Sequence, residues 1–72
     1  MPTNATLVQF EADIGFGSTV ASRILGVSYP AYAKYRSGDR VFPLYHQQHL
    51  AIIYRLSRTE FDRLVKEHGN GR

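Results

Sequence analysis

Two histidines stand at a spacing that could serve metal chemistry. His46 and His49 are three residues apart, which on a helix would place two ligands of one ion on the same face. A third and fourth ligand are missing, because His68 is distant in sequence and the chain contains no cysteine. Ordinary histidines at the surface or the edge of the core are the simpler interpretation. We therefore expect no metal site.

Nucleophiles and phosphate loops have no better support. Serine, histidine and aspartate all occur, but no serine lies in the glycine frame of a nucleophile elbow. Gly15, Gly17 and Gly26 do not follow a strand pattern, so they do not indicate a phosphate-binding loop. We expect no catalytic residue and no cofactor, and hence no enzyme.

Positive charge is distributed unevenly along the chain. Residues 1–17 carry a net charge of −2, residues 18–40 carry +3 and residues 41–72 carry +2, which together give +3. The central segment contains a single acidic residue, Asp39. Its cations are Arg23, Lys34, Arg36 and Arg40. This asymmetry suits a polyanionic partner, although a basic composition alone is a weak signal.

The 72 residues are enough for one small domain with a modest core. Without cysteine no disulfide can reinforce that core, so dimerisation is expected on grounds of stability. No apolar run approaches the ~18 residues of a membrane span, and the N-terminal residues lack the pattern of a signal peptide. We expect a cytoplasmic protein without a membrane partner.

Apolar periodicity predicts three short helices in the first half of the chain. Leu7, Phe10 and Ile14 form one face of the first, which Asn4 or Thr6 would cap and Gly15 and Gly17 would end. Ser18 is the cap candidate for the second, whose helically spaced apolar residues end at Gly26 and are Val20, Ala21, Ile24 and Leu25.

The third helix is expected to follow a turn at Val27 and Ser28 and to run from Tyr29 or Pro30 to Arg36. A proline disfavours helical geometry in the residue before it, so the alternative is a start at Pro30 with Tyr29 as the cap. Residues 37–39 then form a stop and loop.

Two further helices are predicted in the second half. Pro43 would open the fourth, with Leu50, Ile53 and Leu56 on its inner face. Residues 57–60 fit a capping box for the fifth, whose periodic residues are Phe61, Leu64, Val65 and His68. Gly69 would end it. The predicted fold class is all-α, a compact bundle of about five short helices forming one domain over residues 1–69 with a flexible tail at 70–72.

Residues 18–43 meet the steric demands of two helices joined by a tight turn. Gly26 can adopt a positive φ at the turn, and Ser22, four residues earlier, is small enough for the following helix to pack over it. Ala21, Leu25 and Val27 supply the apolar surroundings. Tyr32 and Tyr35 lie three apart on the inner face of the third helix.

The turn Leu25-Gly26-Val27-Ser28, the aromatic Tyr35 and the following Arg36-Ser37-Gly38 resemble phage Cro and repressor proteins, the Cro/C1 or XRE-type helix-turn-helix regulators. The resemblance spans about 26 of the 72 residues. It implies a lambda repressor-like DNA-binding domain with its motif at residues 18–37. It also implies binding to double-stranded DNA, commonly as a homodimer on palindromic sites.

The resemblance implies a role for each polar or exposed position of the motif. The third helix would enter the major groove and present Ser28, Tyr29, Pro30, Ala33 and Lys34. Ser18 and Thr19 would hold a phosphate at the start of the second helix, and Arg36, Ser37 and Arg40 would contact the DNA backbone. Tyr29 and Ala33 could meet thymine methyl groups, and Lys34 could reach guanine or a phosphate.

Two hypotheses for function follow. The first is a sequence-specific transcriptional regulator, a phage or prophage repressor acting as a dimer in a bacterial host cell. The alternative is a helix-turn-helix scaffold that binds and inhibits a host protein, because the face of the third helix lacks Gln, Asn or Arg for bidentate base contacts. Part of the fifth helix could form a dimer contact, and the candidates for an exposed apolar patch are Phe42, Leu44 and Tyr45.

Overall fold

The computed structural model describes residues 3–70, and all regular structure within them is helical. The helices are α1 (Ala5–Ile14), α2 (Ser18–Leu25), α3 (Tyr29–Ser37), α4 (Leu44–Tyr54) and α5 (Arg58–Asn70). The predicted all-α bundle of five short helices is confirmed. Its connections are short, and among helices that follow one another in the chain, α1 packs against α2 and α2 against α3.

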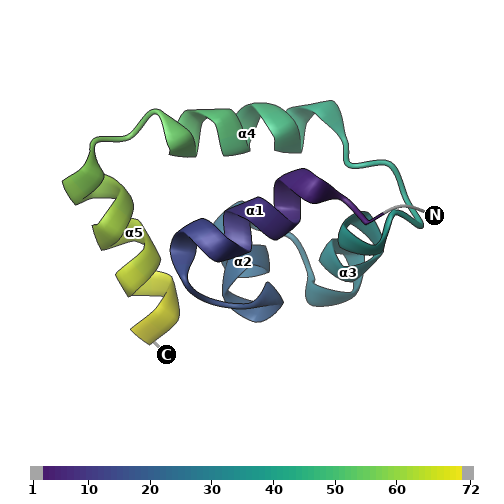
Figure 1. Ribbon diagram of the computed structural model, residues 1–72, viewed down its shortest axis with the longest axis horizontal. Coiled ribbons are helices and arrows are strands. Elements are labelled where there is room, and N and C mark those ends of the chain that lie inside the picture. Colours follow the sequence, from purple (N-terminus) through teal and green to yellow (C-terminus); the bar gives the residue numbers. More distant parts are fainter. Residues whose placement is uncertain (1–2, 71–72) are drawn as a thin grey trace.

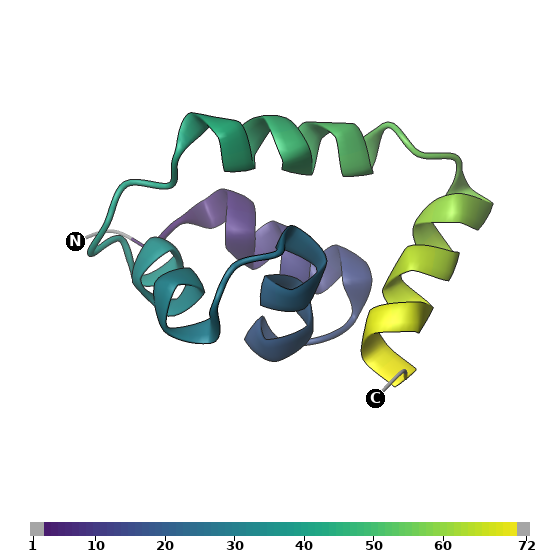
Figure 2. The same cartoon turned by 180° about the vertical axis from the view of Figure 1, so that it is seen from behind.

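Helix α2 occupies the centre of the bundle and contacts each of the other four helices. α1 and α3 pack against α2 and against each other. α4 runs along one edge of the molecule, and α5 turns away from its end to close one side (Figure 1). From behind, α2 and α3 lie side by side with the turn between them in view (Figure 2).

The core forms where the inner faces of all five helices meet. Its largest fully buried side chains are Tyr32, Phe10 and Leu7, which come from α3 and α1. The remaining buried apolar residues surround these three and are Ile14, Ala21, Ile24, Leu25, Tyr35, Phe42, Leu50, Ile53, Phe61 and Val65. The predicted inner faces of the first, third and fifth helices therefore all reach this core.

Local chemistry defines the beginnings of the helices. Asn4 caps α1 by accepting hydrogen bonds from the backbone N–H groups of Thr6 and Leu7. Ser28 caps α3 through a bond from the Ala31 N–H, so Tyr29 is the first helical residue and not the cap. The expected cap at Ser18 is also wrong: Gly17 takes that position, and Ser18 lies inside α2.

The second half departs from the prediction at three points. Pro43 is the N-cap of α4 and not its first residue. Leu56 lies beyond the end of α4, although it still packs against the core. Only one half of the predicted capping box forms: the backbone N–H of Glu60 donates to the side-chain hydroxyl of Ser57 over 3.2 Å.

Gly69 does not end α5. The helix continues to Asn70, and residues 71 and 72 of the expected tail lie outside the described range. The ring of Phe16 covers Gly69 so closely that a Cβ there would lie 2.6 Å from its nearest carbon. A glycine in this helix therefore admits an aromatic ring from the turn between α1 and α2, and the close approach explains its presence. No helix within residues 3–70 has both the length and the apolar character to cross a membrane.

Candidate nucleic-acid interface

The turn between α2 and α3 brings the two helices into direct contact. Gly26 adopts φ +76°, a left-handed backbone conformation that residues other than glycine rarely adopt. Its N–H donates to the carbonyl of Arg23, and the N–H of Val27 donates to that of Ser22. These bonds satisfy the last carbonyls of α2 and turn the chain sharply into α3.

Ser22 of α2, four residues before Gly26, is only 3% exposed. Its hydroxyl donates to the Thr19 carbonyl over 2.8 Å, so the buried polar side chain has a partner. Ala21 beside it is fully buried. Both small residues of this part of α2 are therefore buried, and the close approach of α3 over Ser22 stays a prediction.

α3 has a buried side and an open side. Tyr32 and Tyr35 point into the core, whereas the opposite arc is exposed or half-buried and consists of Tyr29, Pro30, Ala33, Lys34 and Ser37. These residues share one side because an α-helix turns by about 100° per residue. They include four of the five residues that are expected from the sequence to face base edges. The fifth, Ser28, is exposed but uses its hydroxyl oxygen to cap the helix.

One carboxylate oxygen ties α1 to both helices of the unit. Oε2 of Glu11 accepts hydrogen bonds from the Tyr32 hydroxyl (2.7 Å), the Arg36 Nε (2.8 Å) and the Ser18 hydroxyl (3.0 Å). The donors come from the beginning of α2 and from two turns of α3. We call these four residues the Glu11 cluster.

The cluster is held together by charge as well as by hydrogen bonds. Partial burial raises the pKa of Glu11. The hydrogen bonds from Tyr32, Arg36 and Ser18 and the positive charge of Arg36 together lower it by more than burial raises it, so the pKa lies below the ordinary value. Burial, followed by the bond to Glu11, raises the pKa of Tyr32 well above its usual range. Glu11 is therefore ionised and Tyr32 is protonated at neutral pH.

The cluster changes the picture of two predicted phosphate contacts. The Ser18 hydroxyl and the Arg36 Nε both donate to Glu11, so both donors are already engaged within the protein. The Arg36 side chain is still 37% exposed and has further N–H donors beyond Nε. Sequence reasoning missed Glu11, although its position on the inner face, four residues after Leu7, was a signal.

The loop after α3 places another cation beside it. The N–H of Arg40 donates to the carbonyl of Lys34, which also accepts from the hydroxyl of Ser37. Lys34 and Arg40 are both exposed. The ion pairs within residues 3–70 join Arg36 to Glu11 and Arg58 to Asp62, so neither Lys34 nor Arg40 is neutralised by a carboxylate there.

The N-terminus of α2 has no side-chain cap. Gly17 precedes it without a capping oxygen, and Thr19 is exposed in its first turn. The first N–H groups of a helix have no partner inside the helix, and the dipole favours an anion there. This end of α2 therefore offers backbone donors close to Thr19.

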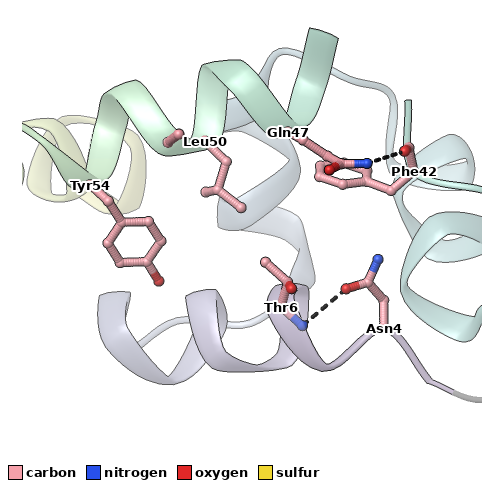
Figure 3. A pocket seen from close by; sticks show the side chains of 7 residues that line it. Asn4, Thr6, Phe42, Gln47, Leu50 and Tyr54 are labelled. Carbon is pink, nitrogen blue, oxygen red and sulfur yellow. Dashed lines mark hydrogen bonds between the residues drawn. The ribbon is translucent and has the colours of Figure 1, made fainter. Parts of the chain in front are cut away.

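A hollow of about 350 Å³ lies away from this unit, between α1 and α4. Figure 3 shows Tyr54 and Leu50 reaching from α4 towards Thr6 of α1. Both side-chain amides that line the hollow have partners: Asn4 caps α1, and the Gln47 amide donates to the Phe42 carbonyl. No group of three or more histidine, aspartate or glutamate side chains in residues 3–70 is arranged to hold a metal ion.

Comparison of the chain with protein-family models, with curated proteins and with solved structures gives no match.

Proposed function

We propose that this protein is a sequence-specific DNA-binding transcriptional regulator of the helix-turn-helix type. The observation that carries the proposal is the α2–Gly26–α3 unit, which buries Ser22 and the inner tyrosines and leaves one whole arc of α3 open. A helix with one free arc on a rigid support is what the major groove accepts. A phage or prophage repressor, dimeric and cytoplasmic in its bacterial host, is the form of this function that we propose.

In this proposal the open arc of α3 reads bases. Lys34 would donate to guanine or to a phosphate, while Tyr29 and Ala33 would contact thymine methyl groups. The phosphates on either side would be held by the uncapped N-terminus of α2 beside Thr19 and by Arg40 and Arg36. The Glu11 cluster would orient the Arg36 guanidinium towards that role.

The test is fluorescence anisotropy of a labelled duplex from the upstream region of the gene, titrated at several salt concentrations. Lys34→Glu and Arg40→Glu should each weaken binding at least about tenfold and make the salt dependence shallower by about one ion. Lys66→Glu is the matched control, because Lys66 is an equally exposed cation on α5. Equal effects from all three reversals would mean that binding responds only to net charge, which would refute this docking surface.

A second candidate function has one specific observation in its favour. Tyr29 is 53% exposed at the start of α3, and exposed tyrosines often anchor protein contacts. The alternative is accordingly a helix-turn-helix scaffold that binds and inhibits a host protein through this residue. Such a complex would resist salt and would be lost in Tyr29→Ala, whereas DNA binding would weaken as salt rises.

A further inference from the structure

Helix α4 has two apolar faces, and the core covers one of them. Leu50 and Ile53 are buried against the bundle. On the other side Leu44, Tyr45 and Ile52 are 66, 67 and 59% exposed. Figures 1 and 2 both show α4 along the edge of the molecule with no helix beyond it. Large apolar side chains that gather on one exposed helix face mark a surface for interaction.

The outer face also lacks charge. Between Arg40 and Arg55, the 14 residues 41–54 contain no Asp, Glu, Lys or Arg, although these make up 21% of the chain. At that frequency about three would be expected. The surface that a cationic chain can place against a copy of itself without repulsion is an uncharged one.

The outer residues are spaced to fit a copy of themselves. Tyr45, Gln48 and Ile52 recur at intervals of three and four, the seam of a coiled coil, with Gln48 at the middle. An antiparallel pair of α4 helices with its two-fold axis at Gln48 brings Leu44 and Tyr45 of one copy against Ala51 and Ile52 of the other. A single polar residue in such a seam fixes its register.

From these observations we infer that the outer face of α4 is the contact with a second copy of this chain, paired antiparallel about Gln48. The helix is about 16 Å long at 1.5 Å per residue, so the contact is small and the dissociation constant is about micromolar or weaker. Because no ion pair contributes, dimerisation does not weaken as salt rises.

Sedimentation velocity over a range of protein concentrations tests the contact. No DNA is present, so its failure is distinguishable from failure of the proposed function. The wild-type chain should pass from monomer to dimer, and Ile52→Glu should raise the dissociation constant at least about tenfold. Val8→Glu is the matched control, since Val8 is an exposed apolar residue of α1. A wild-type chain that stays monomeric, or an equal effect of both variants, would overturn the inference.

Crosslinking locates the two-fold axis without adding a charge to α4. The chain has no cysteine, so Gln48→Cys introduces its sole thiol. Mild oxidation should convert this variant into a disulfide-linked dimer much faster than Glu67→Cys, whose position on α5 is equally exposed. Faster crosslinking at position 67 would place the dimer contact on another face and refute the α4 pairing.

Discussion

Glu11→Gln tests whether the Glu11 cluster stabilises the fold. All three donors, from Tyr32, Arg36 and Ser18, converge on Oε2. A glutamine has the same shape, but its neutral oxygen accepts about two strong bonds, not three. Each hydrogen bond to a charged group is worth about 1.5–3 kcal/mol and each neutral one about 0.5–1.5 kcal/mol.

The loss of one bond and the weakening of two, partly offset by water at the half-exposed Arg36, gives a destabilisation of about 2 kcal/mol. For a domain of this size each kcal/mol lowers Tm by about 4–8 °C, so Tm should fall by about 8–16 °C. Circular dichroism during heating and urea denaturation measures both quantities. Asp13→Asn is the matched control: Asp13 lies on the same helix and also accepts two side-chain bonds, but it is exposed.

Tyr32→Phe removes the hydrogen bond whose donor residue is fully buried and leaves the bonds from Ser18 and Arg36. If Glu11 and Tyr32 interact as the 2.7 Å distance indicates, the double variant should be less destabilised than the sum of the two single variants by about 1 kcal/mol. Strict additivity would refute the direct interaction. A fall in Tm for Glu11→Gln no larger than that for Asp13→Asn would refute the stabilising role of the whole cluster.

Two further predictions concern pH and the turn. The folded pKa of Glu11 lies below the unfolded value near 4.5, so its contribution to stability is complete above that value and is lost as pH falls through the folded pKa. Urea denaturation at a series of pH values should show this decline in the wild type and a shallower one in Glu11→Gln, where Asp13, with its similarly lowered pKa, still titrates; an unchanged pH profile would contradict the assignment. Gly26→Ala places a residue with a side chain in the left-handed region and should lower the free energy of unfolding by about 1–2 kcal/mol. Gly17→Ala, at φ −87° with no neighbour within 4 Å, should lower it by only a few tenths of a kcal/mol. Equal losses of Tm in the two variants would show that the turn does not require glycine.

Sequence patterns sufficed for several features that local chemistry determines. Gly15 and Gly26 end their helices in the left-handed conformation, and each lies directly after an apolar periodic run. Asn4 precedes the first such run and caps it. The periodicity of Phe61 and Val65 gave the inner face of α5. Each of these features depends on residues within one or two turns of one another.

Features that depend on distant residues were not predictable in the same way. Gly69 has the sequence signature of a helix stop, yet α5 continues to Asn70, and the ring of Phe16, more than fifty residues earlier, lies where a Cβ of residue 69 would be. Ser18 has the signature of a cap, but its hydroxyl donates to Glu11 instead. In both cases the contact joins two different elements, 53 residues apart for Phe16 and Gly69 and seven for Glu11 and Ser18, and the periodicity of a single helix does not reveal it.

The Glu11 cluster also bears on the balance of forces in the proposed DNA complex. By engaging Ser18 and part of Arg36, it leaves Lys34, Arg40 and the remaining donors of Arg36 to meet phosphates. Three neutralised phosphates correspond to a slope of log K against log salt of about −3 for one protomer and about −5 for two. One protomer would then bind weakly, and pairing through α4 would double the charge applied to the duplex. The slope of log K against log salt should therefore change from about −3 at protein concentrations below the dimer dissociation constant to about −5 above it. A slope that stays near −3 at all concentrations would show that DNA binding does not depend on dimerisation.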